Sequence, residues 1–277
     1  MVHAAAIQRY EDGRLGGVTT DAVAVEEPLE LRVEGRSIAV IMRTPGHDRE
    51  LAAGFLLTEG LIKSAKDLFD ITSCVAPGGA GKGNAVDAAL ARPDAADLDK
   101  LTRHVFTSSS CGVCSKATIE SVIKRRKPLD DDLRISARLL LSLPKKLAAA
   151  QEDFKTTGGL HACALFDAKG KLLAAREDVG RHNALDKLIG WALLEHRTPL
   201  HGHVVLLSGR VSFEMMQKSH AAGIPVVAAI SAPTSLAVEF AQESAQTLAG
   251  FVRGRTLNIY AGAERVSSRV GRARKTP

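Results

Sequence analysis

The chain has 277 residues, enough to bury a large core and to form two subdomains. Hydrophobic residues make up 45% of it, yet no apolar run reaches the roughly 18 residues that a membrane-spanning helix needs. The first 20 residues show no signal-peptide pattern. We therefore expect a cytoplasmic protein in a reducing compartment, without a membrane partner.

The net charge of +6 comes partly from a basic C-terminal stretch and partly from the basic run at residues 124–127. Such clusters are most often solvated. Aromatic residues form only 4% of the chain and do not alternate with basic ones, as they do where single-stranded bases stack. We expect no nucleic-acid partner, because an acidic small ligand or an acidic protein explains the charge at least as well.

The first quarter of the chain predicts a small mixed unit. Residues 1–25 are polar or irregular, and we expect them to be mobile. Residues 29–33 and 37–43 alternate in hydropathy on either side of a short polar turn, which is typical of a β-hairpin. Asp48 is then placed to cap a helix that ends near Gly60.

Two short strands are expected next, at residues 69–76 and 85–90. The glycine-rich turn between them, residues 78–83, imitates a phosphate-binding loop. Such a loop needs a serine or threonine after its lysine to hold magnesium, and Gly83 stands there instead. We interpret the turn as a hairpin loop.

Cys111 and Cys114 form a CxxC motif directly after three serines. Residues 117–127 have apolar positions at helical spacing, so the two thiols are expected at or just before a helix N-terminus. A helix N-terminus stabilises a thiolate and lowers the thiol pKa, and Lys116 adds a positive charge nearby. The motif therefore predicts a nucleophilic pair.

The spacing of the cysteines leaves several uses open. Two cysteines separated by two residues are half of a zinc site, but the other two, Cys74 and Cys163, stand alone in apolar runs typical of small buried side chains. Dithiol redox chemistry needs the motif at the end of a strand, which a short strand before Cys111 could provide. A structural disulfide is the least favoured, because so close a pair is strained. The residues alone leave zinc, redox chemistry and sulfur transfer open.

The second half of the chain alternates strands with helices. Residues 130–154 are expected to be helical with a break at Pro144. Such alternation predicts a three-layer α/β unit, in which helices cover both faces of one sheet. Strands are expected at residues 161–166, 171–175, 203–207, 224–230, 247–252 and 257–260, and further helices after residue 180 and at 211–222 and 235–246.

Polar residues follow several of these strands. In open α/β sheets, ligands gather at the carboxyl ends of strands, where helix N-termini offer free N–H groups to anions. The alternative for the densest segment, residues 176–187, is a surface helix held by ion pairs. The candidate residues for a phosphorylated, nucleotide-like ligand are Asp178, Gly180, Arg181, His182, Asn183, Lys187, Ser208, Arg210 and Ser231.

The predicted turn between the last two strands carries two arginines around a glycine, and guanidinium groups suit phosphate. The residues of this turn are Phe251, Val252, Arg253, Gly254, Arg255 and Thr256.

Seven motifs together resemble the FdhD/NarQ family of formate dehydrogenase accessory sulfurtransferases. The resemblance extends over residues 27–260, and its most specific parts are the CxxC and the long motif at residues 176–190. The motifs are LAAGFLLTEGLI (51–62), SCGVCSKA (110–117), GGLHACAL (158–165), REDVGRHNALDKLIG (176–190), SGRVSFEMMQKS (208–219), IPVVAAISAPTSLAVE (224–239) and GFVRGRTLNIY (250–260).

The resemblance implies a function. Members of the family accept sulfur from a cysteine desulfurase and pass it to the molybdenum or tungsten bis(molybdopterin guanine dinucleotide) cofactor of formate dehydrogenase. Carried onto this chain, it implies that Cys111 holds a persulfide and Cys114 assists, and that residues 251–256 bind the cofactor, which a guanine nucleotide would mimic. Ser115 replaces a glycine of many members, and Val252 a cysteine of some, but neither change removes the nucleophile. A non-catalytic chaperone that protects the cofactor is the alternative.

The resemblance also implies a homodimer and a cytidine-deaminase-like fold for the second half. A zinc deaminase needs HxE followed by PCxxC, whereas here the CxxC comes first and His161 is not followed by a glutamate two residues later. We therefore expect neither deamination nor a metal site. The predicted parts are a mobile segment (1–25), an α+β subdomain ending in the CxxC loop and helix (26–128), the cytidine-deaminase-like α/β domain (129–262) and a basic tail (263–277).

Overall fold

The structure is a computed structural model that describes residues 1–74, 83–93, 106–107 and 127–268. Two larger sheets, a separate hairpin and a short parallel pair make up its strands. None of the helices in these ranges is both long and apolar enough to cross a membrane. The glycine-rich turn at 78–82, both cysteines of the CxxC and the end of the basic tail lie outside the described residues.

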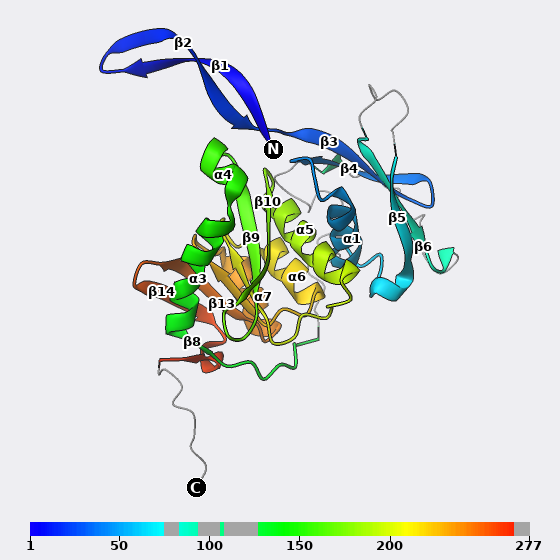
Figure 1. Ribbon diagram of the computed structural model, residues 1–277. Helices are drawn as coiled ribbons and strands as arrows, with labels where there is room; N and C mark the ends of the chain where they lie inside the picture. The colour runs from blue at the N-terminus through cyan, green and yellow to red at the C-terminus, as the bar shows by residue number, and fades with distance from the viewer. Residues whose placement is uncertain (75–82, 94–105, 108–126, 269–277) are drawn as a thin grey trace.

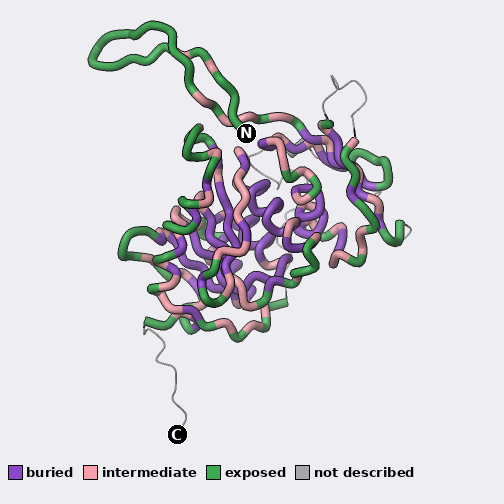
Figure 2. The backbone as a smooth tube through the Cα atoms, in the orientation of Figure 1, coloured by how far each residue is buried: buried purple, intermediate pink, exposed green. Residues whose placement is uncertain are grey.

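The N-terminal residues form an antiparallel hairpin, β1 (Val2–Glu11) and β2 (Arg14–Ala24). It projects from the body of the protein (Figure 1), and nearly all of it is exposed (Figure 2). The expectation of irregular chain here was wrong. Asp12 and Gly13 both have positive φ, 50° and 81°, as the tight turn of a two-residue hairpin loop requires, and Asp-Gly is a strong signal for that turn.

The first large sheet has five strands in the order β5-β6-β3-β4-β7. The hairpin expected from the alternating pattern is confirmed as the antiparallel pair of β3 and β4. Helix α1 (Asp48–Thr58) follows β4, with His47 rather than Asp48 at its N-cap, and a 3-10 turn (Ala65–Asp67) precedes β5. The strands are β3 (Glu27–Val33), β4 (Arg36–Arg43), β5 (Leu68–Cys74), β6 (Ala85–Leu90) and β7 (Phe106–Thr107).

The second large sheet has six strands in the order β10-β9-β11-β12-β13-β14. Its five helices are α3 (Ala137–Ala150), α4 (Glu152–Thr157), α5 (Arg181–Leu194), α6 (Phe213–Ala221) and α7 (Ser235–Glu243). Its strands are β9 (His161–Phe166), β10 (Leu172–Asp178), β11 (Val204–Leu207), β12 (Val226–Ala229), β13 (Thr247–Arg253) and β14 (Thr256–Ala261).

Helices cover both faces of this sheet, as predicted. Successive strand side chains point to opposite faces of the sheet. Those on one face pack against the buried leucines of α3, and those on the other face pack against α5, α6 and α7. The fold is therefore mixed α/β, with the similarity to cytidine deaminases still a prediction. The core on the α5 side continues into the five-stranded sheet, because the same cluster of buried side chains includes Leu29, Leu51, Leu188 and Val205.

Helix α3 runs through Pro144 without the expected break. A proline in a helix interior costs ~3 kcal/mol or more. Leu140, Leu143 and Leu147 are fully buried against the sheet, and each such leucine contributes about 1.5–3 kcal/mol, so packing outweighs the proline. The helix also begins later than expected, at a cap where Ser136 Oγ accepts from Leu139 N at 3.2 Å.

Part of the expected basic tail is ordered structure. Strand β15 (Val266–Ser267) pairs in parallel with β8 (Ile135–Ser136), after a 3-10 turn at Ala263–Arg265. The Arg265 side chain is buried and donates to the carbonyl of Asp131 at 3.1 Å. The prediction of a solvated tail starting at residue 263 was therefore wrong for residues 263–267.

Candidate functional site

The polar residues that follow the strands meet at one edge of the six-stranded sheet. Strand β9 runs antiparallel to β10 and β11, while β11, β12 and β13 run parallel to one another. The ends of β10 to β13 therefore lie beside the start of β9. We call this edge the polar rim and define it by His161, Arg181, Ser208, Arg210, Ser231 and residues 251–256.

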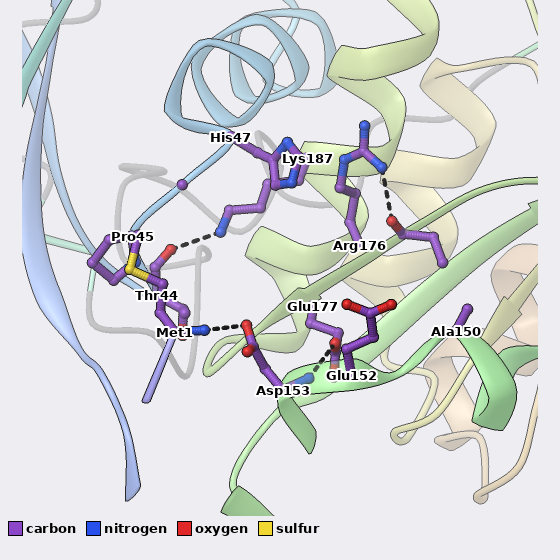
Figure 3. A pocket seen from close by; sticks show the side chains of 12 residues that line it. Met1, Thr44, Pro45, His47, Ala150, Glu152, Asp153, Arg176, Glu177 and Lys187 are labelled. Carbon is purple, nitrogen blue, oxygen red and sulfur yellow. Dashed lines mark hydrogen bonds and ion pairs between the residues drawn. The ribbon is translucent and has the colours of Figure 1, made fainter. Parts of the chain in front are cut away.

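Asp178 and Lys187 form a buried ion pair behind the rim, with Lys187 Nζ 2.7 Å from Asp178 Oδ2. The lysine also donates to the carbonyl of Thr44 at 2.7 Å, as Figure 3 shows, and the Thr44 N–H donates back to Asp178 at 3.1 Å. Asn183 donates to the other oxygen of Asp178 at 2.9 Å. These side chains join the end of β10 and the start of α5 to the chain after β4.

The sequence assigned Asp178, Asn183 and Lys187 to ligand binding, but their polar groups face inward. They are respectively 0%, 7% and 1% exposed. A buried charge is stable only when it is paired and hydrogen-bonded, so these residues hold the rim in place instead of contacting a ligand. The alternative of a surface helix was also wrong. Gly180 belongs to the same support, since a Cβ there would lie 2.8 Å from Asn183 Nδ2.

A second buried network joins α1, α5 and α6. Lys218 Nζ lies 2.9 Å from Asp186 Oδ2, 2.9 Å from Thr58 Oγ1 and 3.1 Å from Glu59 Oε1. Burial raises the pKa of Asp186 to about 6, although Lys218 opposes the rise. Burial also disfavours the charged Lys218, but Asp186 and Glu59 outweigh it and raise the lysine pKa.

His182 links α5 to the start of α6. Its Nε2 is 3.3 Å from Glu214 Oε2 and 3.4 Å from Ser212 Oγ. Burial, together with the positive charges of Arg181 and Lys218, lowers the pKa of His182 to about 3. The ring is therefore neutral at physiological pH, and because a carboxylate only accepts, its proton is on Nε2. His182, predicted to contact the ligand, is also buried in this packing.

The side chains that do reach the rim are positively charged or hydroxyl-bearing. The loop after β11 is pinned to β9, because Ala162 N donates to Ser208 Oγ and Ser208 N donates to the carbonyl of Ala162, both at 2.9 Å. Arg210 is exposed and Arg181 is half-buried. Burial and the charges of these two arginines lower the pKa of His161. The rim thus concentrates positive charge that suits an anion.

The turn of residues 251–256 extends the rim. Phe251 has a φ of 51°, and its N–H donates to the carbonyl of Ser231 at 3.1 Å, which ties the turn to the end of β12. The Arg253 guanidinium lies 5.4 Å from the centre of the Phe251 ring. Arg253, Gly254, Arg255 and Thr256 are exposed, whereas Val252 is fully buried and contributes only to the core.

Cys111 and Cys114 lie outside the described residues, so the predicted helix N-terminus has no structural test. The chain shortly before them is described: β7 pairs in parallel with β4, with Thr107 opposite Ile41. Thr44 directly follows the last residue of β4, and its N–H donates to Asp178 at the end of β10. The C-terminal end of β7, at Thr107, therefore lies on the same side of the protein as Thr44 and Asp178, which support the rim.

The two described cysteines differ. Cys163 is fully buried in β9, and burial followed by the charges of Asp186 and Asp178 raises its pKa, so it is a poor nucleophile. Cys74 is half-buried at the end of β5. Among the described residues, no group of three or more His, Cys, Asp or Glu side chains is arranged to hold a metal ion.

Comparison with known families matches residues 24–267 to the FdhD/NarQ family. The chain belongs to this family. The sulfur carrier protein FdhD of Mycolicibacterium paratuberculosis is 52% identical over 254 residues, which span 89% of this chain and 92% of the relative. The protein of the same name from Streptomyces avermitilis is 49% identical over 267 residues, which span 94% and 95%.

A solved structure is similar as well. A protein from Desulfotalea psychrophila, described as a formate dehydrogenase accessory protein, superposes with a TM-score of 0.75 and 25% sequence identity. The superposition spans 96% of this chain and 99% of the other. The shared fold thus extends over both large sheets of this FdhD/NarQ chain.

Two positions at or behind the rim of this FdhD/NarQ member, His161 and Thr44, were not among the candidates predicted from the sequence. The sequence suggested His161 only as a zinc ligand, whereas the structure places it at the start of β9, beside the end of β10. Thr44 holds the Asp178 and Lys187 pair from a distance of more than 130 residues in the chain. His161 could have been found as the polar residue before a buried strand, but no local signal identifies Thr44.

Proposed function

We propose that this protein is a sulfur carrier that formate dehydrogenase requires. It accepts sulfur from a cysteine desulfurase and delivers it to the molybdenum or tungsten bis(molybdopterin guanine dinucleotide) cofactor. The observation that carries the proposal is the polar rim: an exposed, positively charged edge that lies on the side where the chain leading to the CxxC leaves β7. The names of the curated relatives support the same role.

The short chain segment between Thr107 and Cys111 supports the proposal that the Cys111 thiol reacts with a substrate bound at the rim. Cys111 comes four positions after Thr107, and a chain extends by at most ~3.6 Å per residue, so its Cα stays within roughly 14 Å of the end of β7. Asp178, which supports the rim, is joined to the end of β4 beside it. A thiol at this distance from the rim can transfer sulfur to a substrate bound there.

The proposed chemistry is thiol exchange of sulfane sulfur. The Cys111 thiolate attacks the outer sulfur of the desulfurase persulfide, the S–S bond breaks, and the desulfurase cysteine leaves as a thiolate. Cys111 then carries the persulfide. If the Cys114 thiolate attacks the inner sulfur, a disulfide forms between Cys111 and Cys114 and hydrosulfide leaves for the metal. The dithiol supplies the two electrons, and a cellular thiol reductant restores it.

The rim contributes binding in this proposal. The cofactor is the substrate, and its guanine dinucleotide arms carry phosphates. Exposed Arg210, Arg253 and Arg255 are available to those phosphates, since guanidinium groups form paired hydrogen bonds with phosphate oxygens. We include a homodimer and a cytoplasmic location in the proposal, as the resemblance implies.

The test is sulfur loading followed by activation. The protein is incubated with a cysteine desulfurase and cysteine, and mass spectrometry locates the added sulfur. We expect it on Cys111, with Cys111→Ala unable to activate formate dehydrogenase and the matched variant Cys74→Ala fully active. Full activation by Cys111→Ala would overturn the assignment.

A second candidate, a chaperone that only binds and protects the cofactor, is favoured by one observation. Arg253 and Arg255 are exposed in a turn that includes neither cysteine of the CxxC. A chaperone would keep its activity in the double variant Cys111→Ala, Cys114→Ala, while losing it when Arg253 and Arg255 are both replaced by alanine. The sulfur carrier loses activity in both.

A further inference from the structure

Exposed apolar side chains are concentrated on the N-terminal hairpin. Ten large hydrophobic side chains are exposed in the part of the chain that the structure describes, and six of them belong to residues 1–24. Tyr10, Leu15 and Val18 are exposed most strongly among these six, at 70%, 63% and 71%. The hairpin projects from the body of the protein (Figures 1 and 2). A cluster of exposed apolar side chains of this kind marks an interaction site.

The register of the hairpin places these side chains on one face. Side chains alternate between the two faces along a strand, and paired residues share a face. Val2 and Tyr10 are eight positions apart and therefore share a face with their partners Ala24 and Leu15. The residues of this face, which we call the apolar face, are Val2, Ala4, Ala6, Gln8, Tyr10, Leu15, Val18, Thr20, Ala22 and Ala24.

The apolar face carries no charged side chain. The charged and histidine side chains of the two strands all belong to the opposite face: His3, Arg9, Glu11, Arg14 and Asp21. Such a separation is typical of a sheet with one face in water and the other covered by protein. The opposite face therefore suits solvent, and the apolar face requires a partner.

The size of the side chains changes along the apolar face. Its small residues, four alanines, lie in the half near the body of the protein, which we call the root. Its large residues, Tyr10, Leu15 and Val18, lie in the half near the turn, which we call the tip. A second copy of the same face fits this gradient when the two hairpins are antiparallel, because each tip then lies over the partner's alanines. An antiparallel contact between identical faces has two-fold symmetry, as most homodimers do.

The dimensions of the face determine how strong such a contact can be. Ten residues of β1 at ~3.4 Å each make the hairpin ~34 Å long, and two strands ~4.8 Å apart make it ~10 Å wide. Each copy thus offers an outline of about 340 Å², and two copies about 700 Å², which is less than the roughly 1,200 Å² of stable interfaces. The area therefore supports a reversible association. A lone two-stranded hairpin is only marginally stable in water, so the contact also stabilises the hairpin itself.

We propose that two copies of this chain associate through the apolar faces of their hairpins, packed antiparallel about a two-fold axis. Tyr10 and Leu15 at the tip of one hairpin then lie over the alanines at the root of the other. The inference rests on the proposed function, which includes a homodimer, and it assigns the contact between the copies to residues 2–24.

Sedimentation velocity of the full chain over a wide range of concentrations tests the proposal. Leu15→Asp places a charge on the apolar face and should raise the dissociation constant of the dimer at least about tenfold. Thr19→Asp, which places the same charge on the opposite face of the same strand, is the matched control and should associate as the unchanged chain does. Both positions are exposed, so neither change disturbs the core.

Ala4→Tyr tests the antiparallel fit. If exposed hydrophobicity alone drove the association, an added tyrosine would tighten it. In the proposed contact the partner's tip needs the space above Ala4, so this variant should instead associate at least about tenfold more weakly. Tighter association of Ala4→Tyr overturns the proposed packing.

Photochemical cross-linking gives a measurement that keeps the apolar face intact. p-Benzoylphenylalanine in place of Tyr10, in a mixture of unlabelled and ¹⁵N-labelled chains, identifies by mass spectrometry the cross-links that join two copies. We expect them to connect position 10 with residues 2–6 or 20–24 of the partner subunit. Cross-links from tip to tip overturn the antiparallel arrangement.

Two further results would overturn the proposal. One is a chain that stays monomeric at every concentration, which would leave the apolar face to a different protein. The other is a dimer that Leu15→Asp and Thr19→Asp form equally well, which would place the contact elsewhere.

These outcomes are distinct from those of the sulfur-loading experiment. Sedimentation involves no sulfur chemistry, so absence of sulfur on Cys111 refutes the proposed function and leaves the measured association unchanged. If Cys111 is loaded and the hairpin variants associate normally, only the inference about the hairpin fails.

Discussion

Gly54 on α1 and Gly190 on α5 lie against each other where the two helices cross. A Cβ on Gly54 would lie 1.9 Å from the carbonyl oxygen of Asp186, and one on Gly190 would lie 1.7 Å from that of Glu50. The two backbones are therefore in direct contact, side by side in Figure 1. This crossing brings the chain after β4 close enough for Thr44 and Thr58 to bond to α5.

Replacing either glycine by alanine should force the helices apart. The atoms that the new methyl meets are backbone, which cannot rotate away, so overpacking should cost ~3 kcal/mol or more in the free energy of unfolding of Gly190→Ala. Urea unfolding measures it. Gly17→Ala, where a Cβ meets nothing within 4 Å, should change stability by less than ~0.5 kcal/mol. Equal stability of the two variants would contradict the close crossing.

The pair of Glu50 and Arg176 should make stability depend on pH in the acid range. Burial opposes ionisation of Glu50, but its hydrogen bonds with Arg176, at 2.5 and 2.8 Å, and with His47 lower its pKa from 4.5 to about 2. A carboxyl whose pKa is lower in the folded state stabilises the fold above its unfolded pKa. That stabilisation, at most about 3 kcal/mol, is lost as pH falls from 4.5 towards 2.

Glu50→Gln removes this titration. Its free energy of unfolding, measured in urea at several pH values, should fall less steeply between pH 4.5 and 2 than that of the unchanged chain. Glu243→Gln, at an exposed position on α7, should keep the original slope. The interpretation is wrong if Glu50→Gln and the unchanged chain lose stability in parallel.

Lys218 and Asp186 should be strongly coupled. Both are at most 3% exposed, so Asp186→Asn leaves the buried lysine with one ion-pair partner among the described residues, Glu59, and should destabilise the fold by about 3–5 kcal/mol. The double variant Asp186→Asn, Lys218→Met removes both charges and should lose less than the sum of the two single variants. Thermal unfolding checks this, with exposed Asp132→Asn as control. Additive losses would show that the pair is not coupled.

The sequence predicted those elements whose signals are local. The β3–β4 hairpin followed from alternating hydropathy, and the two-sided sheet followed from strands that alternate with helices. Asp12 and Gly13 carried an equally local signal for the N-terminal hairpin that composition alone concealed. Pro144 shows the opposite case, because the burial that keeps α3 intact depends on a sheet formed by distant residues.

The candidate site also contains some positions that local signals predict and others that depend on distant residues. Strand-end position correctly brought Ser208, Arg210 and Ser231 to one edge. His182 and Asp186 are four residues apart and so share one face of α5, but helical spacing alone cannot show that this face is buried. Their partners, Glu214 and Lys218, come from α6, and the closeness of α5 and α6 is a property of the packed core, with no trace in the spacing along either helix.

The turn at residues 251–256 should bind phosphate through Arg253 and Arg255. Both side chains are exposed, so their replacement leaves the core intact, whereas Val252 beside them is fully buried. Each lost guanidinium contact should weaken GDP binding about tenfold, and the affinity of the unchanged chain should fall as salt rises, because exposed charges are screened. Titrations of Arg253→Ala and Arg255→Ala at low and high salt measure both effects.

Arg134→Ala is the matched control for these titrations, since Arg134 is exposed just before β8 and away from the strand ends that form the rim. If Arg253→Ala weakens GDP binding by the same factor at low and high salt, the arginine acts through its contact with the Phe251 ring and not through phosphate. The guanidinium lies 5.4 Å from the centre of that ring. A GDP affinity that neither substitution changes would remove residues 251–256 from the binding site altogether.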